Sequence, residues 1–244
     1  MNIILQREYL IFKHNIIFYL CLWTLIPMII YLFISFPFSF YIKLPNGISY
    51  LNWSSVGNWV SASSTLSFII SMNIASKYID ENSYSRTMLC TPISNKEHLL
   101  GGLIWSLIMG FIQLIFSLAI TLSFKSANLF LLDILLIIIY IIPIIILISN
   151  IGFLIGLSCK GGLIRIIISL IFFLFIYFSS GLFVPLNNGL PYIFTLSPIY
   201  LSVQNIQAIM ANDSSMISSS LILVFISILF FIINLVISFK VFKS

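Results

Sequence analysis

The side chains that can perform chemistry are few in this sequence, and half of the acids lie in one stretch. Of 244 residues, six are Asp or Glu, eleven are Lys or Arg and two are His. Three of the acids fall within YIDENSYSRTMLCTPISNKE, residues 78–97, between two strongly apolar segments. Such a stretch can offer ion pairs and hydrogen bonds to another protein. It can equally be an ordinary solvated loop.

The spacing of the reactive residues does not point to an enzyme or a metal centre. His14 and His98 are far apart and lack a plausible partner acid and nucleophile, so we expect each to cap a membrane span at the interface. Three scattered cysteines are too few for a disulfide framework or a metal knuckle. The pattern G-x-x-x-x-G-K-[ST] is absent, so ATP cannot bind through a P-loop. We therefore expect no catalytic residue, no metal and no directly bound cofactor.

The composition predicts an all-α integral membrane protein. The chain is 61% hydrophobic and 7% charged, with a mean hydropathy of +1.18. A soluble domain carries about 25% charged residues, which this sequence cannot supply to a water-facing surface. We expect residues 1–244 to form a single transmembrane domain.

Six segments approach the roughly 20 apolar residues that cross a bilayer as a helix. The second is rich in serine but has no charge, and small polar residues suit a helix that packs against other helices. The predicted spans are residues 16–36, 54–76, 99–122, 130–157, 162–182 and 217–239.

The positive charges orient these spans. Six spans place nine Lys and Arg on one side and only Lys43 and Lys125 on the other. The positive-inside rule makes the nine-charge side cytoplasmic. Both termini and the stretch 78–97 are therefore expected in the cytoplasm. This asymmetry accounts for the net charge of +5 better than nucleic-acid binding does.

The connection after the fifth span is unusually apolar for an exposed loop. Residues 181–210 read GLFVPLNNGLPYIFTLSPIYLSVQNIQAIM, and three prolines prevent one continuous helix. Irregular backbone is tolerated at membrane depth only where protein or water surrounds it. We therefore expect short re-entrant helices here.

Several motifs in this topology resemble the membrane subunits of type 2 ATP-binding-cassette (ABC) exporters, over most of the chain. QREYLIFKHN, with Pro27 in the following span, resembles that family's N-terminal interfacial helix and first span. ISYLNWSSVGNWVSASS is similar to the start of its second span, with Val56-Gly57 in place of a Pro-Gly pair. RTMLCTPISNKEHLLGG and SSGLFVPLNNGLPYIFTLSPIYLSVQNIQAI are similar to its cytoplasmic signature and its extracellular re-entrant motif.

The resemblance implies a permease subunit of an exporter in a bacterial plasma membrane. It implies a cytoplasmic coupling helix between spans 2 and 3, and extracellular re-entrant helices between spans 5 and 6. The partners would be two ABC ATPase subunits carrying ATP and Mg, a second identical or related permease, and membrane lipid, but no nucleic acid. The cargo would be amphipathic or lipid-like: a drug, a peptide, a lipid or a lipid-linked glycan.

The resemblance also assigns residues to roles. The alternatives are a solvated loop for the first group and lipid-facing or packing positions for the second. The ATPase-coupling loop would use Asp80, Glu81, Tyr84, Arg86, Thr87, Met88, Thr91 and Pro92. The substrate pathway would use Asn58, Ser61, Thr65, Asn73, Phe173 and Tyr177, and the outer gate Gly181, Phe183 and Pro185.

Two rival functions stay open at this point. An ion-coupled secondary transporter should carry ionisable groups at mid-membrane, whereas Asp133 lies near the outer end of its span. A non-transporting membrane assembly factor is the other alternative. Within the spans, we expect Gly152 and Gly156 to support helix packing. Gln113, Asn150 and Asn234 are expected to bond between helices.

Overall fold

The structure, a computed structural model, describes residues 2–44, 49–80, 94–124, 131–184, 197–210 and 218–241. Within these ranges every regular element is helical and there is no β-strand, which confirms the all-α prediction. The elements are α1 (Asn2–His14), α2 (Ile16–Ile30), the π-helix η1 (Tyr31–Ser35), α3 (Phe36–Phe38), α4 (Tyr50–Asp80), α6 (Asn95–Ser123), α7 (Leu131–Ser158), α8 (Gly162–Ser179), α10 (Pro198–Met210) and α11 (Ser218–Val241).

A helix covers most of each of the six predicted spans, and four of these helices are long and apolar enough to cross a membrane. The four are Ile16–Phe38, Lys96–Ser123, Leu132–Ser158 and Leu221–Ser238. Of the other two, α4 is long but polar, and α8 is apolar but short. The protein is therefore an integral, multi-pass membrane protein.

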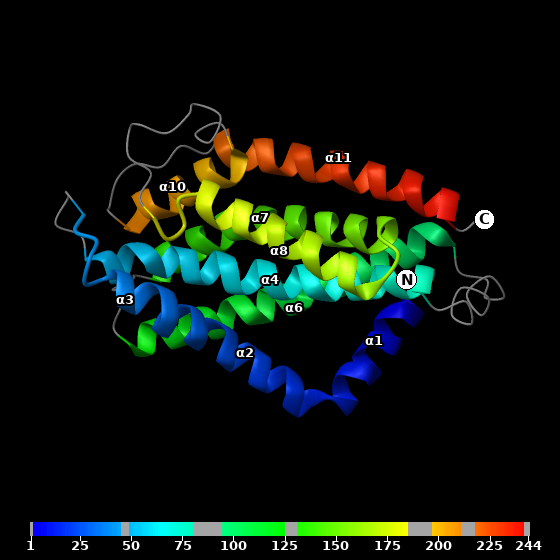
Figure 1. Cartoon of the computed structure of the whole chain (residues 1–244), viewed down its shortest axis with the longest axis horizontal. Helices are drawn as coiled ribbons and strands as arrows, with labels where there is room; N and C mark the ends of the chain where they lie inside the picture. Colours follow the sequence, from blue (N-terminus) through cyan, green and yellow to red (C-terminus); the bar gives the residue numbers. More distant parts are fainter. Residues whose placement is uncertain are drawn as a thin grey trace.

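The long helices run side by side, with α4 inside the bundle (Figure 1). Helix α4 packs most extensively against α7 and then against α6, and α11 packs against α7. Helix α2 contacts α6 and α4, while α1 turns away from α2 and lies against α6. The start of α1 and the end of α11 lie at the same end of the bundle (Figure 1).

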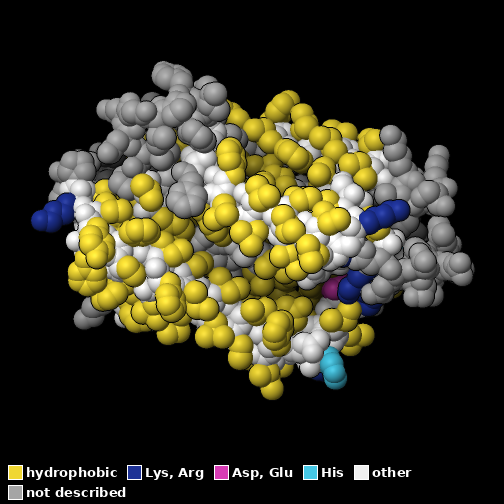
Figure 2. Space-filling model, viewed as in Figure 1, with side chains coloured by type: hydrophobic (Ala, Val, Ile, Leu, Met, Phe, Trp, Pro, Cys, Tyr) yellow, Lys and Arg dark blue, Asp and Glu magenta, His cyan; other side chains and the backbone are white. Residues whose placement is uncertain are grey.

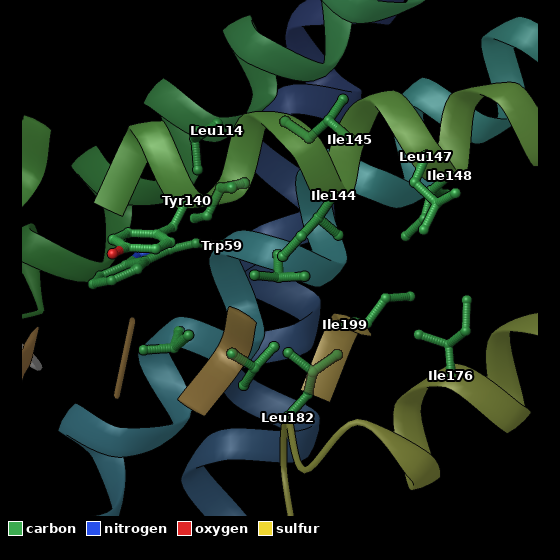
Figure 3. Packing of buried hydrophobic residues seen from close by; sticks show 14 of the residues in the cluster. Trp59, Leu114, Tyr140, Ile144, Ile145, Leu147, Ile148, Ile176, Leu182 and Ile199 are labelled. Carbon is green, nitrogen blue, oxygen red and sulfur yellow. The ribbon is translucent and has the colours of Figure 1, made fainter. Parts of the chain in front are cut away.

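The main apolar core forms where α4, α6 and α7 meet. Trp59 and Tyr140 lie close together there, and Leu182 and Ile199 complete the core from the chain after α8 (Figure 3). The indole N–H of Trp59 donates a hydrogen bond of 2.7 Å to Thr121 Oγ1, so this large ring is buried without an unpaired donor.

The serines of α4 face inward rather than toward lipid. Ser54, Ser63 and Ser71 are fully enclosed, and each hydroxyl donates to a carbonyl three or four residues earlier in the same helix. Their small volume lets neighbouring helices approach closely. The polarity of α4 therefore reflects its central position in the bundle.

The predicted glycine pair does form a close helix contact. A Cβ added to Gly152 would lie 2.7 Å from the Phe68 carbonyl oxygen, and one added to Gly156 would lie 2.6 Å from that of Met72. Neither approach leaves room for a side chain. The packing role predicted for Gly152 and Gly156 is thus confirmed, and the partner helix is α4.

The predicted hydrogen bonds between helices are also confirmed. Gln113 Nε2 on α6 donates to the carbonyl oxygen of Trp23 on α2 over 3.1 Å. Asn234 Nδ2 on α11 donates to the carbonyl oxygen of Asn150 on α7 over 2.9 Å. Each bond pairs a buried amide nitrogen with a carbonyl oxygen on another helix, while the amide oxygens of Gln113 and Asn234 are buried without a hydrogen-bond partner.

One predicted cap is wrong. His98 does not cap α6, because it lies inside the helix and is only 3% exposed. Ser94 caps α6 instead, in a capping box: its hydroxyl accepts from the Glu97 N–H, and the Glu97 carboxylate accepts from the Ser94 N–H.

The outer surface of the bundle matches a membrane protein. Hydrophobic side chains cover the middle of the face seen in Figure 2, and the Lys and Arg side chains visible there lie toward its ends. On α8, Leu163, Ile171 and Phe175 are more than half exposed. Such side chains suit contact with lipid or with another membrane protein.

Candidate substrate pathway and outer gate

Most of the predicted coupling loop lies outside the described residues. This applies to Glu81, Tyr84, Arg86, Thr87, Met88, Thr91 and Pro92. Asp80 is the last residue of α4, and its side chain is not described. The role of these residues therefore stays a prediction.

Two of the predicted pathway residues, Asn58 and Ser61, are buried inside the chain. Asn58 Nδ2 donates to the carbonyl oxygen of Pro27 over 3.1 Å, and Asn58 Oδ1 accepts from the Ser117 hydroxyl over 3.4 Å. The Ser61 hydroxyl donates to the carbonyl oxygen of Asn58. In this conformation Asn58 joins α4 to α2 and α6, whereas the Ser61 bond stays within α4. Both residues are buried, so no open surface reaches them.

Three other predicted pathway residues come together where α4 meets α8. The hydroxyls of Thr65 and Tyr177 lie 2.6 Å apart, so α4 and α8 share a hydrogen bond. The rings of Phe173 and Tyr177 lie 5.6 Å apart, and Phe68 packs edge-on against Phe173 at 4.8 Å. The result is a half-buried aromatic cluster with a polar tip at Tyr177.

Asn73 lies apart from this cluster, on the open side of α4. Thr65, Ile69 and Asn73 are spaced four residues apart and therefore share one helix face. Thr65 is half-buried, whereas Ile69 and Asn73 are exposed. An amide that faced lipid would lack hydrogen-bond partners, which is costly in an apolar environment. We call this face of α4 the open stripe; within a membrane, its exposed amide would require a polar neighbour.

The predicted outer gate sits where the chain leaves α8. Gly181 has a φ of +66°, a conformation that favours glycine, and it ends the helix. Phe183 is 5% exposed, and its ring packs edge-on against Tyr177 at 6.2 Å. Pro185 lies outside the described residues. The two described gate residues thus adjoin the aromatic cluster.

Three residues outside the predicted set hold this turn in place. The Tyr50 hydroxyl donates to the Phe183 carbonyl oxygen over 2.6 Å, and burial raises the pKa of Tyr50 above its usual range, so the phenol remains a donor. Gln207 Nε2 on α10 donates to the Gly181 carbonyl oxygen over 3.4 Å. A Cβ on Gly57 would lie 2.4 Å from the Leu182 carbonyl oxygen, so only glycine permits this approach.

The sequence gives a local indication for only one of these three residues. A glycine inside a helix lowers helix stability and often marks a close approach, and Gly57 fits that description. Tyr50 and Gln207 act over 133 and 26 residues of sequence separation, which no local pattern reports.

Metal chemistry has no support in the described part of the chain. There, no three His, Cys, Asp or Glu side chains gather in an arrangement that could hold a metal ion. The described pathway residues offer hydroxyl, amide and aromatic groups. Such groups can contact an amphipathic molecule.

Comparison with known proteins gives one match. The sequence model of a family described as "ABC-2 family transporter protein" matches residues 52–236. This range holds the open stripe, the aromatic cluster and the turn at 181–184. Neither the curated proteins nor the solved structures contain a significant match.

Proposed function

Because the chain belongs to the ABC-2 family of transporter proteins, we propose that it is the membrane permease subunit of an ABC exporter. An ATPase on a separate chain would bind ATP and Mg and drive the transport cycle. The observation that carries this proposal is the family match, since it spans the helices that hold the candidate pathway.

We propose six membrane crossings, including α4 and α8. Helix α4 is polar because it is enclosed by other helices, so its composition does not oppose a crossing. Its 31 residues span about 46 Å, which exceeds the hydrocarbon thickness of a bilayer. Helix α8 runs alongside α4 and α7 in the same bundle (Figure 1).

The cargo is expected to be amphipathic or lipid-like and to move along the face formed by α4 and α8. Thr65 and Asn73 offer hydrogen bonds, and Phe173 and Tyr177 offer apolar contact. Asn58 and Ser61, which the sequence places in the same pathway, are buried in this conformation: Asn58 joins α4 to α2, and Ser61 bonds within α4. Gly181 and Phe183 are proposed to form the outer end of the path.

A second permease copy is the proposed neighbour of the open stripe. A water-filled path between two copies would solvate the exposed amide of Asn73, whereas lipid would not. The copies would be identical or closely related, and each would dock one ATPase.

The absence of charge within the path favours this reading over an ion-coupled transporter. Among the described residues, the charged residues of α4, α7 and α8 lie within the terminal turns of these helices: two acids, Asp80 and Asp133, and two cations, Lys77 and Arg165. A secondary transporter needs ionisable groups near the bilayer midplane.

Co-purification with an ATPase tests the proposal. We expect the tagged chain, isolated from its native membrane, to bring down an ABC ATPase, and the complex in lipid nanodiscs to hydrolyse ATP. Tyr84→Ala and Arg86→Glu in the coupling loop should reduce the ATPase recovered while the amount of inserted permease stays the same. Recovery of the wild-type chain with no ATPase would overturn the proposal. If both variants recover as much ATPase as the wild type, the coupling role assigned to this loop is wrong.

A further inference from the structure

A buried hydrogen bond joins α4 and α6 at the end of the bundle where α1 packs against α6. The Tyr78 hydroxyl and His98 Nδ1 lie 3.1 Å apart, and the two rings meet edge-to-face with centroids 5.8 Å apart. Tyr78 is 5% exposed and His98 is 3% exposed. We call this pair the inner latch.

The inner latch lies where the chain leaves the bundle and returns to it. Tyr78 is in the last turn of α4, and His98 is in the first turn of α6. The residues between them, 79–97, include the stretch predicted to contact an ATPase. Any force on that stretch reaches the membrane helices through these two ends.

Buried apolar side chains surround the latch. Ala75, Leu99 and Leu103 belong to the same buried apolar cluster as Tyr78. Burial raises the pKa of Tyr78, an effect that the nearby Arg7 opposes and Glu8 supports, so the phenol stays neutral. Burial, and to a smaller extent Arg7, lowers the pKa of His98 to about 4, so both partners are neutral near pH 7 and the phenol can donate to His98 Nδ1.

Helix α1 is joined to the same point. Ile4 packs on Gly101 of α6, where an added Cβ would lie 3.0 Å from the Ile4 side chain. The next turn of α1 carries Glu8, which is 5% exposed and accepts from Arg7 Nε over 3.1 Å. Three helices therefore meet within one turn of the inner latch.

We propose that Tyr78 and His98 act as positioning residues that make the ends of α4 and α6 move as one body. Without the bond, a force on residues 79–97 would separate the two helix ends instead of shifting the bundle. The mechanical role rests on the proposed function, whereas the bond itself can be tested on the isolated chain.

The same two helices supply a matched control. Trp59 Nε1 donates to Thr121 Oγ1 over 2.7 Å near the opposite ends of α4 and α6. Thr121→Val removes this bond with little change in side-chain volume. It therefore loses an α4–α6 hydrogen bond but leaves the inner latch intact.

Hydrogen exchange on the chain in lipid nanodiscs tests the latch without any partner. Tyr78→Phe and His98→Leu should each raise amide exchange at residues 76–80 and 96–100 by about three- to tenfold, the range that the loss of one hydrogen bond implies. The double variant should exchange no faster than the more affected single variant, because both changes break one bond. Thr121→Val should leave these amides unchanged. Fully additive single effects, or the same increase in Thr121→Val, would refute the latch.

Distance measurements on the ATPase complex test the mechanical role. Spin labels at Lys77→Cys and Lys96→Cys, in a chain without other cysteines, report the separation of the two helix ends. With ATP and vanadate, we expect an unchanged distance in the otherwise wild-type protein and a broader, longer one when Tyr78→Phe is added. Identical distance distributions with and without Tyr78→Phe would overturn the mechanical role. If no ATPase co-purifies, the proposed function fails while the exchange result still decides the latch.

Discussion

The carbonyl oxygen of Trp23 receives its hydrogen bond from a residue far away in the sequence, because the local donor is missing. Pro27 has no N–H, so the α2 hydrogen bond that would normally reach the Trp23 carbonyl oxygen is missing. Gln113 on α6 supplies the replacement donor from 90 residues away. The proline and the glutamine are therefore one structural unit.

This pairing predicts a specific double-variant result. Gln113→Leu should destabilise the folded chain by about 1 kcal/mol, because it leaves a buried carbonyl oxygen unpaired. Pro27→Ala restores the backbone donor, so the double variant Pro27→Ala/Gln113→Leu should lose less stability than the sum of the single variants. Unfolding in SDS-containing mixed micelles, followed by tryptophan fluorescence, measures the three values. Strict additivity would show that the two residues act independently.

The sequence predicted Gln113, Asn150 and Asn234 as bonds between helices because an isolated amide in an apolar span has few other uses. It did not predict the acceptors: Gln113 and Asn234 donate to backbone carbonyl oxygens on other helices. Asn150 donates to Ile146 of its own helix and accepts from Asn234 through its side-chain oxygen. Asn58 illustrates the limit. Its amide type suits both a substrate pathway and a helix contact, and only the three-dimensional packing places it against Pro27.

At the scale of elements, the sequence predicted where the helices lie but not where they are irregular. Apolar length located the spans, and Pro198 correctly signalled a break, since α10 begins there. The π-helical turn at Tyr31–Ser35 interrupts the first span without a sequence signal. Helix α8 ends at Ser179 rather than at 182, because Gly181 adopts a positive φ.

The seam between α4 and α7 gives an element-scale prediction. Gly156→Ala places a Cβ within 2.6 Å of both the Ala75 Cβ and the Met72 carbonyl oxygen, so the two helices must separate. We expect a loss of about 1–3 kcal/mol in stability. The fraction of protein that remains monodisperse after heating, measured by size-exclusion chromatography, reports this loss.

Gly162→Ala is the matched control for this change. It is the same substitution at a helical glycine, but a Cβ there meets nothing within 4 Å. Its stability should equal or slightly exceed that of the wild type, because alanine restricts the unfolded chain. If Gly156→Ala and Gly162→Ala lose the same stability, the loss comes from the change in backbone freedom and not from the contact between α4 and α7.

At the scale of the whole molecule, the distribution of positive charge supports the proposed six crossings. Counting only the four long apolar helices as spans places five of the eleven Lys and Arg on the side of the termini and six on the other side. Counting α4 and α8 as well changes this division to nine and two. Of these two arrangements, the six-span one satisfies the positive-inside rule.

The two arrangements predict opposite sides for two positions. With six spans, residue 125 faces outward and residue 160 faces the cytoplasm, whereas four spans reverse both. In a chain whose native cysteines are replaced, a membrane-impermeant maleimide should label Lys125→Cys in intact cells and should label Lys160→Cys only after permeabilisation. Lys43→Cys and Lys243→Cys are the controls, because both arrangements place residue 43 outside and residue 243 inside.

The reverse labelling of positions 125 and 160 would remove α4 and α8 from the membrane, and with them the proposed pathway. The predicted labelling would place the open stripe of α4 within the bilayer, where the exposed amide of Asn73 requires a polar neighbour.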